Sequence, residues 1–518
     1  MDKEIKDYSV LLINPPYPGK NADPSISLGY LASVIKDAGW RVYIWDEEAE
    51  YFYKEKVSAI MGLIQRLKID LVGFTLTTPF VRFAYNLADI IKSRFDIPII
   101  AGGTHATLCP KEVLERSAFE AAVIGEGEQT VLDLIGSFRG NKGLKGVPGI
   151  AYKDAQGNVI INERRPPIQN LDTLPFCLES QAILDDNKGG RFAQIVTSRG
   201  CPGKCIFCGS LALGKQFRFR SAENIFEEVL SLHEKYGITH FRFRDDAMTI
   251  NRKNFEKICG LFIAHRNLKF TWTCASRVDG LDSSLLNTMK DAGCVFIDLG
   301  METASDRIMK EIKKNISIGK VREAIENCDL INLPVGINLM SGFPFETKED
   351  IKCNMDFVKP LVNKKNIMLN VGLVLRPYPG TQIYDVYHKR FGFTEWWLDR
   401  GRSIAVSEDY TPLYLSSSLG SWTLPEDPVL ELDFFKYSPE VRKAIKRFIR
   451  YKCLFSMKKC YGKVKLAAIL FLYYLSKYLY KINPYLERST LRNLFMFVLR
   501  LKRVGSGAGK LKNLAGQL

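Results

Sequence analysis

Apolar and polar positions alternate in two long series along the chain. In the first series, which spans residues 1–145, short continuous apolar runs alternate with segments whose apolar residues recur at helical spacing. The expected strands are 9–14, 41–45, 70–75, 97–103 and 121–125, and the expected helices are 27–39, 81–95 and 130–138. Continuous apolar strands separated by amphipathic helices are typical of a parallel sheet covered on both faces. The pattern predicts an α/β domain with a doubly wound parallel sheet, in which ligands bind beyond the carboxyl ends of the strands.

The second series covers residues 188–400 and again alternates apolar runs with helical patterns. The expected strands are 192–198, 240–245, 270–274, 295–300, 334–340 and 370–375, with clear helical patterns at 222–237 and 283–293. Six strand–helix repeats predict a partial TIM-type (β/α)6 barrel. In such barrels the functional residues lie at the C-terminal ends of the strands.

Residues 146–187 lack this alternation and are predicted to form a connector between the two units. Residues 149–162 have the pattern of a hairpin that turns at 154–158. The proline-rich run at 164–175 predicts an extended link.

The C-terminal region, residues 401–518, holds the basic excess of the chain. From Val441 to the end there are 19 Lys and Arg residues and one acidic residue, Glu487, so this segment carries +18. Because the whole chain carries +16, the remaining residues carry −2. The body of the protein therefore has no overall attraction for nucleic acid.

Residues 441–452 are predicted to form an amphipathic basic helix within a helical C-terminal region. Its apolar positions are Val441, Ala444, Ile445, Phe448 and Ile449, and its cations are Arg442, Lys443, Lys446, Arg447 and Arg450. Three uses fit this pattern: a cap on the barrel, peripheral attachment to an anionic membrane surface, or RNA binding. The uncharged run at 466–476 is shorter than the roughly 20 residues that span a bilayer.

The sequence predicts a cytoplasmic location, and its basic tail suits attachment to the inner face of the membrane. The N-terminus has neither the basic region nor the long apolar run of a signal peptide. The 12 cysteines are scattered without even spacing, which suits a reducing compartment better than a disulfide scaffold.

Three of these cysteines, Cys201, Cys205 and Cys208, form a C-x3-C-x2-C array after the first predicted barrel strand. Zinc is one interpretation, because His233 or another cysteine could add a fourth ligand, but no second C-x2-C follows. The other interpretation is an iron–sulfur cluster. A four-iron cluster held by three thiolates leaves one iron free, and that iron would be a binding site.

With Phe207 before its last cysteine, the array resembles the C-x3-C-x-aromatic-C motif of the radical S-adenosylmethionine (SAM) superfamily. The resemblance implies that Cys201, Cys205 and Cys208 hold a [4Fe-4S] cluster whose free iron binds SAM through its amino and carboxylate groups. One electron, delivered by a low-potential electron donor, would then cleave SAM. The resulting 5′-deoxyadenosyl radical takes hydrogen from unactivated carbon.

Further strand ends of the predicted barrel resemble the same family. Asp245 and Asp246 end the second strand, where the family contacts the SAM amino group, although a turn or N-cap role fits them too. Arg277 ends the third strand, where a plain salt bridge fits equally well. Glu302 lies in a stretch similar to the family's GIES sequence, which implies a contact with the ribose or amino group of SAM.

The N-terminal domain resembles the Rossmann-like cobalamin-binding domain that precedes many radical SAM barrels. The implied cobalamin contacts are Thr75, Thr77, Thr78, Gly102, Gly103, Gly125, Glu126 and Gly127. Glycine at 102 and 103 would let the backbone approach the nucleotide tail of cobalamin closely. The D-x-H-x-x-G sequence that supplies a cobalt-ligating histidine in mutase-type domains is absent. The resemblance thus implies either cobalamin without a protein nitrogen on its lower face, or this fold without cobalamin.

Together these features predict a cobalamin-dependent radical SAM enzyme that modifies an unactivated carbon, by methyl transfer or by ring or carbon–carbon bond formation. The basic tail favours a small lipid or isoprenoid-like substrate. One rival is a methylthiotransferase that modifies tRNA, but its N-terminal domain would carry cluster cysteines, and before residue 190 this chain has only Cys109 and Cys177. The other rival, a non-enzymatic cobalamin or redox sensor, would not need the array together with Asp246 and Glu302 on one rim.

Overall fold

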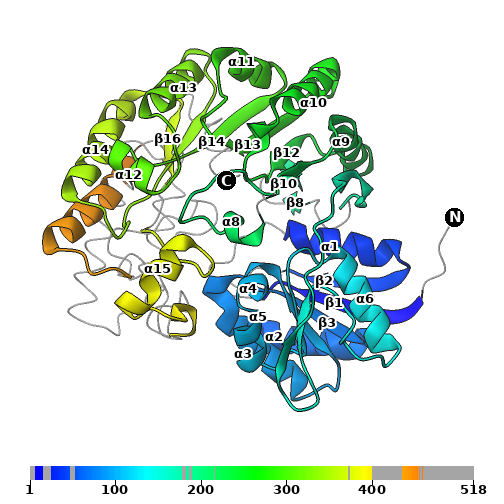
Figure 1. The fold of residues 1–518 in the computed structure, drawn as a ribbon. Helices are drawn as coiled ribbons and strands as arrows, with labels where there is room; N and C mark the ends of the chain where they lie inside the picture. Colours follow the sequence, from blue (N-terminus) through cyan, green and yellow to red (C-terminus); the bar gives the residue numbers. More distant parts are fainter. Residues whose placement is uncertain are drawn as a thin grey trace, which may run out of the picture.

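The computed structural model describes residues 6–15, 25–46, 53–177, 183–185, 190–214, 216–370, 374–399 and 434–452, together with residues 454, 455 and 458. Two α/β units lie next to each other, an N-terminal sheet domain drawn in blue and cyan and a larger unit drawn mainly in green (Figure 1). Each unit corresponds to one of the two alternating series in the sequence.

The N-terminal domain is a parallel sheet with strand order β2-β1-β3-β4-β5. Its strands are β1 (Lys6–Ile13), β2 (Trp40–Trp45), β3 (Leu71–Thr75), β4 (Ile99–Gly102) and β5 (Ala121–Val123). Its helices are α1 (Ile26–Asp37), α2 (Tyr53–Leu67), α3 (Val81–Lys92), α4 (Gly103–Leu108), α5 (Pro110–Glu115) and α6 (Glu128–Arg139). Val10 and Leu12 belong to the core on one face of the sheet and Leu11 and Ile13 to the core on the other. Burial on both faces explains why the strands are continuously apolar.

The predicted hairpin is present as β6 (Ile150–Lys153) and β7 (Val159–Ile161), which are antiparallel. It extends the N-terminal sheet, because β6 pairs with the open edge of β5. The chain then runs across α1, where Leu171 and Leu174 pack against Tyr30 and Val34.

The second unit is an open barrel of six parallel strands with the antiparallel strand β8 (Ile183–Asp185) at one edge. The parallel strands are β9 (Gly190–Ile195), β12 (His240–Phe243), β13 (Thr271–Ser276), β14 (Cys294–Glu302), β15 (Val335–Leu339) and β16 (Ile367–Asn370). The helices are α9 (Ala222–Tyr236), α10 (Arg252–Ala264), α11 (Ser283–Asp291), α12 (Asp306–Glu311), α13 (Ile318–Leu330) and α14 (Lys348–Val358). They form the outer layer in Figure 1.

The sixth strand differs from its prediction at 370–375. It begins earlier because Ile367 pairs with Val335 and continues in register to Asn370. Residues 371–373 lie outside the described residues, and Val374 forms an isolated bridge with Ser341.

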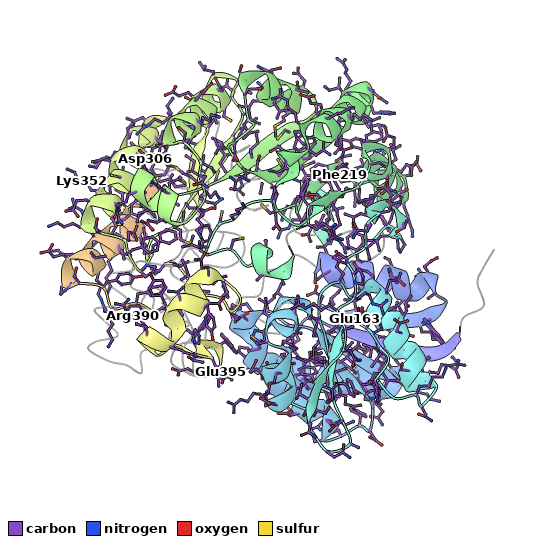
Figure 2. All side chains as sticks on the ribbon, viewed as in Figure 1. Glu163, Phe219, Asp306, Lys352, Arg390 and Glu395 are labelled. Atoms are coloured by element: carbon purple, nitrogen blue, oxygen red, sulfur yellow. The ribbon has the colours of Figure 1, made fainter. Side chains whose placement is uncertain are left out.

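Beyond the barrel, the chain returns to the N-terminal domain through α15 (Gln382–Phe391) and the short helix η6 (Trp396–Leu398). Glu395, labelled in Figure 2 beside the N-terminal domain, pairs with Arg116 at 3.2 Å on an exposed surface. The ring of Trp397 lies 5.2 Å from that of His105 in the N-terminal domain.

The predicted basic helix is present at residues 439–452. Its apolar residues Ile445, Phe448 and Ile449 are buried in the barrel core, which favours the interpretation as a barrel cap for this helix. The tail segments beyond residue 458 lie outside the described residues. Within the described chain, no helix has the length and apolar character needed to span a membrane.

Candidate functional site

The three cysteines lie in the loop that follows β9, at the carboxyl end of the barrel strands. This loop starts and ends on a two-stranded antiparallel ribbon formed by β10 (Ser198–Arg199) and β11 (Arg218–Phe219). Gly203 lies between two sulfurs, because a Cβ there would be 3.3 Å from Sγ of Cys201 and 3.8 Å from Sγ of Cys205. The Gly203 amide donates to Sγ of Cys201 at 3.4 Å. Backbone amides directed at cysteine sulfur are the kind of contact that tunes iron–sulfur clusters.

Two cations lie next to the cysteines. Burial raises the pKa of the Cys205 thiol, and the positive charges of Lys314 and Arg277 act against this rise by favouring the thiolate. Arg277 is held by Asp279 at 2.9 Å and by the carbonyl oxygen of Lys314 at 3.1 Å. Three cysteines with two adjacent cations fit an anionic thiolate-bound cluster. Among the described residues, no group of three or more His, Cys, Asp or Glu side chains is arranged to hold a single metal ion.

Glu302 lies at the end of β14, near the cysteine loop, and its contact with SAM stays a prediction. Its φ is +70°, in the left-handed region, and the pairing of β14 with β15 is irregular between Gly300 and Glu302. Its Oε1 accepts a hydrogen bond from Nζ of Lys314 at 2.8 Å, and both side chains are largely buried. Lys314 was not predicted, because it follows α12 in a turn and its local sequence has no recognisable motif.

Asp245 and Asp246 have different surroundings at the end of β12. Oδ1 of Asp245 accepts hydrogen bonds from the amide and the hydroxyl of Thr197 at 2.9 Å each, and from the amide and hydroxyl of Ser198. Burial raises the pKa of Asp245 to about 6, although these hydrogen bonds oppose the rise. Asp245 thus holds the backbone just before the cysteine loop, through a contact between two strand ends and not through a local turn or N-cap. Its contact with SAM stays a prediction. Asp246 is exposed, and its contact with SAM stays a prediction.

The loops after β3 and β4 lie against each other in the N-terminal domain. The amide of Leu76 donates to the carbonyl of Gly102 at 2.8 Å. Gly103 has φ +89°, and a Cβ there would be 2.9 Å from the backbone N and O of Leu76 and from Oγ1 of Thr75. Glycine is therefore required at 103 by both conformation and space. Thr77 is exposed beside these loops.

His105 is fully buried, and both of its ring nitrogens have partners. Nδ1 lies 3.1 Å from the Thr78 hydroxyl and Nε2 lies 2.9 Å from Oε2 of Glu112. Tyr85 donates to the same carboxylate oxygen at 3.0 Å. His105 thus joins the loops after β3 and β4 through Thr78 and Glu112.

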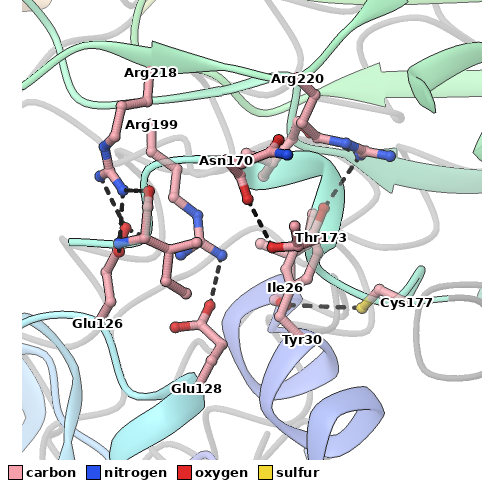
Figure 3. A network of polar contacts seen from close by, with 12 residues as sticks. Ile26, Tyr30, Glu126, Glu128, Asn170, Thr173, Cys177, Arg199, Arg218 and Arg220 are labelled. Carbon is pink, nitrogen blue, oxygen red and sulfur yellow. Dashed lines mark hydrogen bonds and ion pairs between the residues drawn. The ribbon is translucent and has the colours of Figure 1, made fainter. Parts of the chain in front are cut away.

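The loop after β5 contacts the barrel. The Glu126 carboxylate accepts hydrogen bonds from Arg199 at 3.1 Å and from Arg218 at 2.9 Å (Figure 3). It also accepts one from the amide of Ile168 at 2.7 Å. Burial alone would raise the pKa of Glu126, but the hydrogen bond from Arg218 and the charge of Arg199 outweigh it and hold this pKa below its usual value. The neighbouring Gly125 has φ +88°, a backbone conformation that strains any other residue, although nothing would lie within 4 Å of a Cβ there.

The fold and the site define a radical SAM barrel joined to a cobalamin-type sheet domain. Residues 195–358 match the model of the radical SAM superfamily, and residues 21–135 match that of the B12 binding domain. The chain belongs to the radical SAM superfamily, among its cobalamin-dependent members. It is an enzyme whose cofactors are a [4Fe-4S] cluster, SAM and cobalamin.

Two relatives and one solved structure illustrate the similarity. An uncharacterized methyltransferase of Pyrococcus horikoshii is 33% identical over 392 residues, which are 74% of this chain and 83% of the relative. The anaerobic magnesium-protoporphyrin IX monomethyl ester cyclase of Rubrivivax gelatinosus is 29% identical over 360 residues, 66% of this chain and 64% of the relative. The radical SAM methyltransferase TsrM of Kitasatospora setae, with tryptophan and a SAM analogue bound, has a TM-score of 0.62 at 17% identity, covering 74% of this chain and 77% of its own. At that identity the last likeness bears on the fold alone.

Proposed function

We propose that the protein transfers a methyl group from cobalamin to an unactivated carbon of an apolar small molecule. The observation that supports this most strongly is the meeting of three loops. The loops after β4 and β5 of the sheet domain both contact the cysteine loop of the barrel, through α4 against α8 (Ser210–Leu213) and through Glu126 against Arg199. Ligands at the carboxyl ends of both sheets would therefore be neighbours. The similarity to a methyltransferase over most of the chain favours methyl transfer.

Three groups of residues would hold the cluster and SAM. Cys201, Cys205 and Cys208 would hold the cluster, while Arg277 and Lys314 stabilise its negative charge. Glu302, held by Lys314, would orient SAM through its amino group or ribose. When bound, the reduced cluster supplies the electron that cleaves SAM, and cobalamin supplies the methyl group.

An apolar substrate is supported by the side chains beside the cysteine loop. Phe207 contacts Phe343 edge to face with ring centres 6.0 Å apart, and Phe343 stacks on Phe345 at 6.1 Å. Phe207, Phe345 and Met340 are only partly buried, so they offer apolar surface at the rim of the barrel. Such surface favours binding of a lipid or isoprenoid-like molecule.

The proposal predicts a labelled apolar product. Reconstituted enzyme is incubated without oxygen with a reductant, cobalamin that carries no methyl group, SAM carrying an isotopically labelled methyl group, and a lipid extract from cells that lack the gene. The reduced cobalamin would take its methyl group from SAM, so the label would pass through cobalamin to the product. We expect 5′-deoxyadenosine and a lipid-soluble product that has gained the labelled methyl group, detected by mass spectrometry. Formation of 5′-deoxyadenosine with an altered lipid of unchanged carbon count would favour a cyclase-type reaction, as in the R. gelatinosus relative, and would overturn methyl transfer. Unaltered lipids, with label only in water-soluble products, would overturn the apolar substrate.

We also propose that the basic C-terminal region attracts an anionic membrane surface by charge. The helix at 439–452 buries its apolar face, but Lys443 and Arg447 are exposed on its other side. Because the attraction is electrostatic, we expect sedimentation with phosphatidylglycerol vesicles in low salt, and release when the salt approaches about 1 M, where the Debye length is roughly 3 Å. Equal sedimentation with phosphatidylcholine vesicles, or none with either lipid, would contradict the proposal.

A further inference from the structure

The ribbon that carries the cysteine loop has two arginines directly opposite each other. Arg199 ends β10, Arg218 begins β11, and the two residues are paired across the ribbon. The ribbon is only two residues long on each side, so it has little backbone pairing of its own. Like charges placed directly opposite each other destabilise strand pairing. Without residues from outside the barrel, the ribbon at the base of the cysteine loop would therefore pair weakly.

The opposing charges come from the other domain. Glu126 accepts hydrogen bonds from both arginines, with two parallel contacts to Arg218 at 2.9 and 3.0 Å and one to Arg199 at 3.1 Å. Glu128, the first residue of α6, accepts a second hydrogen bond from Arg199 at 2.6 Å. The guanidinium of Arg199 also lies over the ring of Tyr30, 5.4 Å from its centre. Figure 3 shows both arginines extending from the ribbon toward the two carboxylates.

These four residues, here named the interdomain ion-pair network, are well shielded from water. The side chain of Glu128 is 6% exposed, that of Arg218 is 12%, and those of Arg199 and Glu126 are 19% and 20%. Ion pairs shielded to this degree are screened much less than surface pairs. Loss of one partner is costly because it leaves a charge without compensation.

We propose that Glu126 and Glu128 are positioning residues for the iron–sulfur cluster, because they neutralise Arg199 and Arg218 and so close the ribbon from which the cysteine loop extends. The sheet domain is then part of the cluster site, although none of its residues binds iron. The inference rests on the cluster assignment that the proposed function also uses. Glu126 also lies between Gly125 and Gly127, in the loop expected to contact cobalamin, so the network lies between the expected cobalamin loop and the cysteine loop.

The first test is iron loss from full-length enzyme reconstituted with cluster. Loss of a residue that supports metal ligands typically lowers metal affinity about 10- to 100-fold. We expect Glu126→Gln and Glu128→Gln to release iron to a chelator about 10-fold faster or more, and their reduced clusters to give an altered electron paramagnetic resonance signal. Glu395→Gln is the matched control, because it removes an interdomain ion pair with Arg116 that is exposed and distant from the ribbon. Release from the Glu126 and Glu128 variants at the rate of the control would overturn the proposal.

The second test uses protein without cluster and is independent of the proposed function. Closure of the ribbon should protect the peptide bonds after Arg199 and Arg218 from trypsin in the wild type and in the Glu395→Gln control. We expect brief digestion to cut at these two bonds in the Glu126→Gln/Glu128→Gln double variant, with cuts elsewhere unchanged. Equal protection in all three proteins would overturn the role of the network. If the wild type cannot be reconstituted with a cluster, but trypsin still cuts only the double variant at these bonds, the cluster assignment is contradicted. The role of Glu126 and Glu128 in closing the ribbon would still hold.

Discussion

Replacing Cys201, Cys205 or Cys208 by alanine is expected to give a folded protein that loses its iron and its reductive cleavage of SAM. The loss should exceed about 100-fold, because removing residues that merely support metal ligands already costs 10- to 100-fold. Cleavage is measured as 5′-deoxyadenosine formed under reductant, and iron by metal analysis. The fold should persist, because the thiols lie in a loop and only Cys205 is buried.

The matched control is Cys353→Ala, since Cys353 is exposed on α14, away from the cysteine loop. This variant should keep both its iron and its SAM cleavage. Full iron content in any of the three loop variants, with activity unchanged, would contradict the ligand assignment.

Replacing Gly103 by alanine is expected to weaken cobalamin binding. A non-glycine residue in a sparsely populated backbone region costs about 1–3 kcal/mol. At Gly103 the new Cβ would also lie 2.9 Å from the backbone N and O of Leu76, so the loops after β3 and β4 must separate. We expect the cobalamin affinity to fall at least about 10-fold, which corresponds to about 1.4 kcal/mol. The measurement is cobalamin retained after gel filtration, read from its absorption spectrum.

The control Gly157→Ala separates the strain of a positive φ from the clash that a Cβ at position 103 makes with Leu76. Gly157 has φ +83° in the turn between β6 and β7, and nothing would lie within 4 Å of a Cβ there. The Gly157→Ala variant should lose about as much free energy of unfolding as the strain at Gly103 costs, but it should retain cobalamin. Equal cobalamin retention by the Gly103 and Gly157 variants would contradict the assignment of the cobalamin site to the loops after β3 and β4.

The fold was largely predictable because both units rely on local patterns. Strands buried on two faces, such as β1 and β3, are continuously apolar, and the cysteine array has a spacing that can be read directly. The start of β16 was misplaced because the apolar run from Ile367 to Leu375 contains two possible strand positions, and only pairing with β15 decides between them. The short edge strand β8 has too few residues for a recognisable pattern.

The side-chain arrangement of the site was less predictable. The pairing of Glu126 with Arg199 and Arg218 joins residues 73 and 92 positions apart, and no local pattern reports such contacts. Lys314 reaches Glu302 only because the turn after α12 folds back on β14. Asp245 could be read as a cofactor contact or as a turn residue, and its burial against Thr197 and Ser198 is a tertiary feature.

The central claim is that three cysteines hold an iron–sulfur cluster that cleaves SAM beside a cobalamin domain. The most direct measurement uses wild-type protein purified without oxygen. Iron, sulfide and zinc are measured first, and the same sample is then incubated with SAM, with and without a reductant. We expect about four iron and four sulfide per chain, and 5′-deoxyadenosine that is formed only with reductant. Zinc in place of iron and sulfide, or a full cluster that leaves SAM intact, would contradict the central claim.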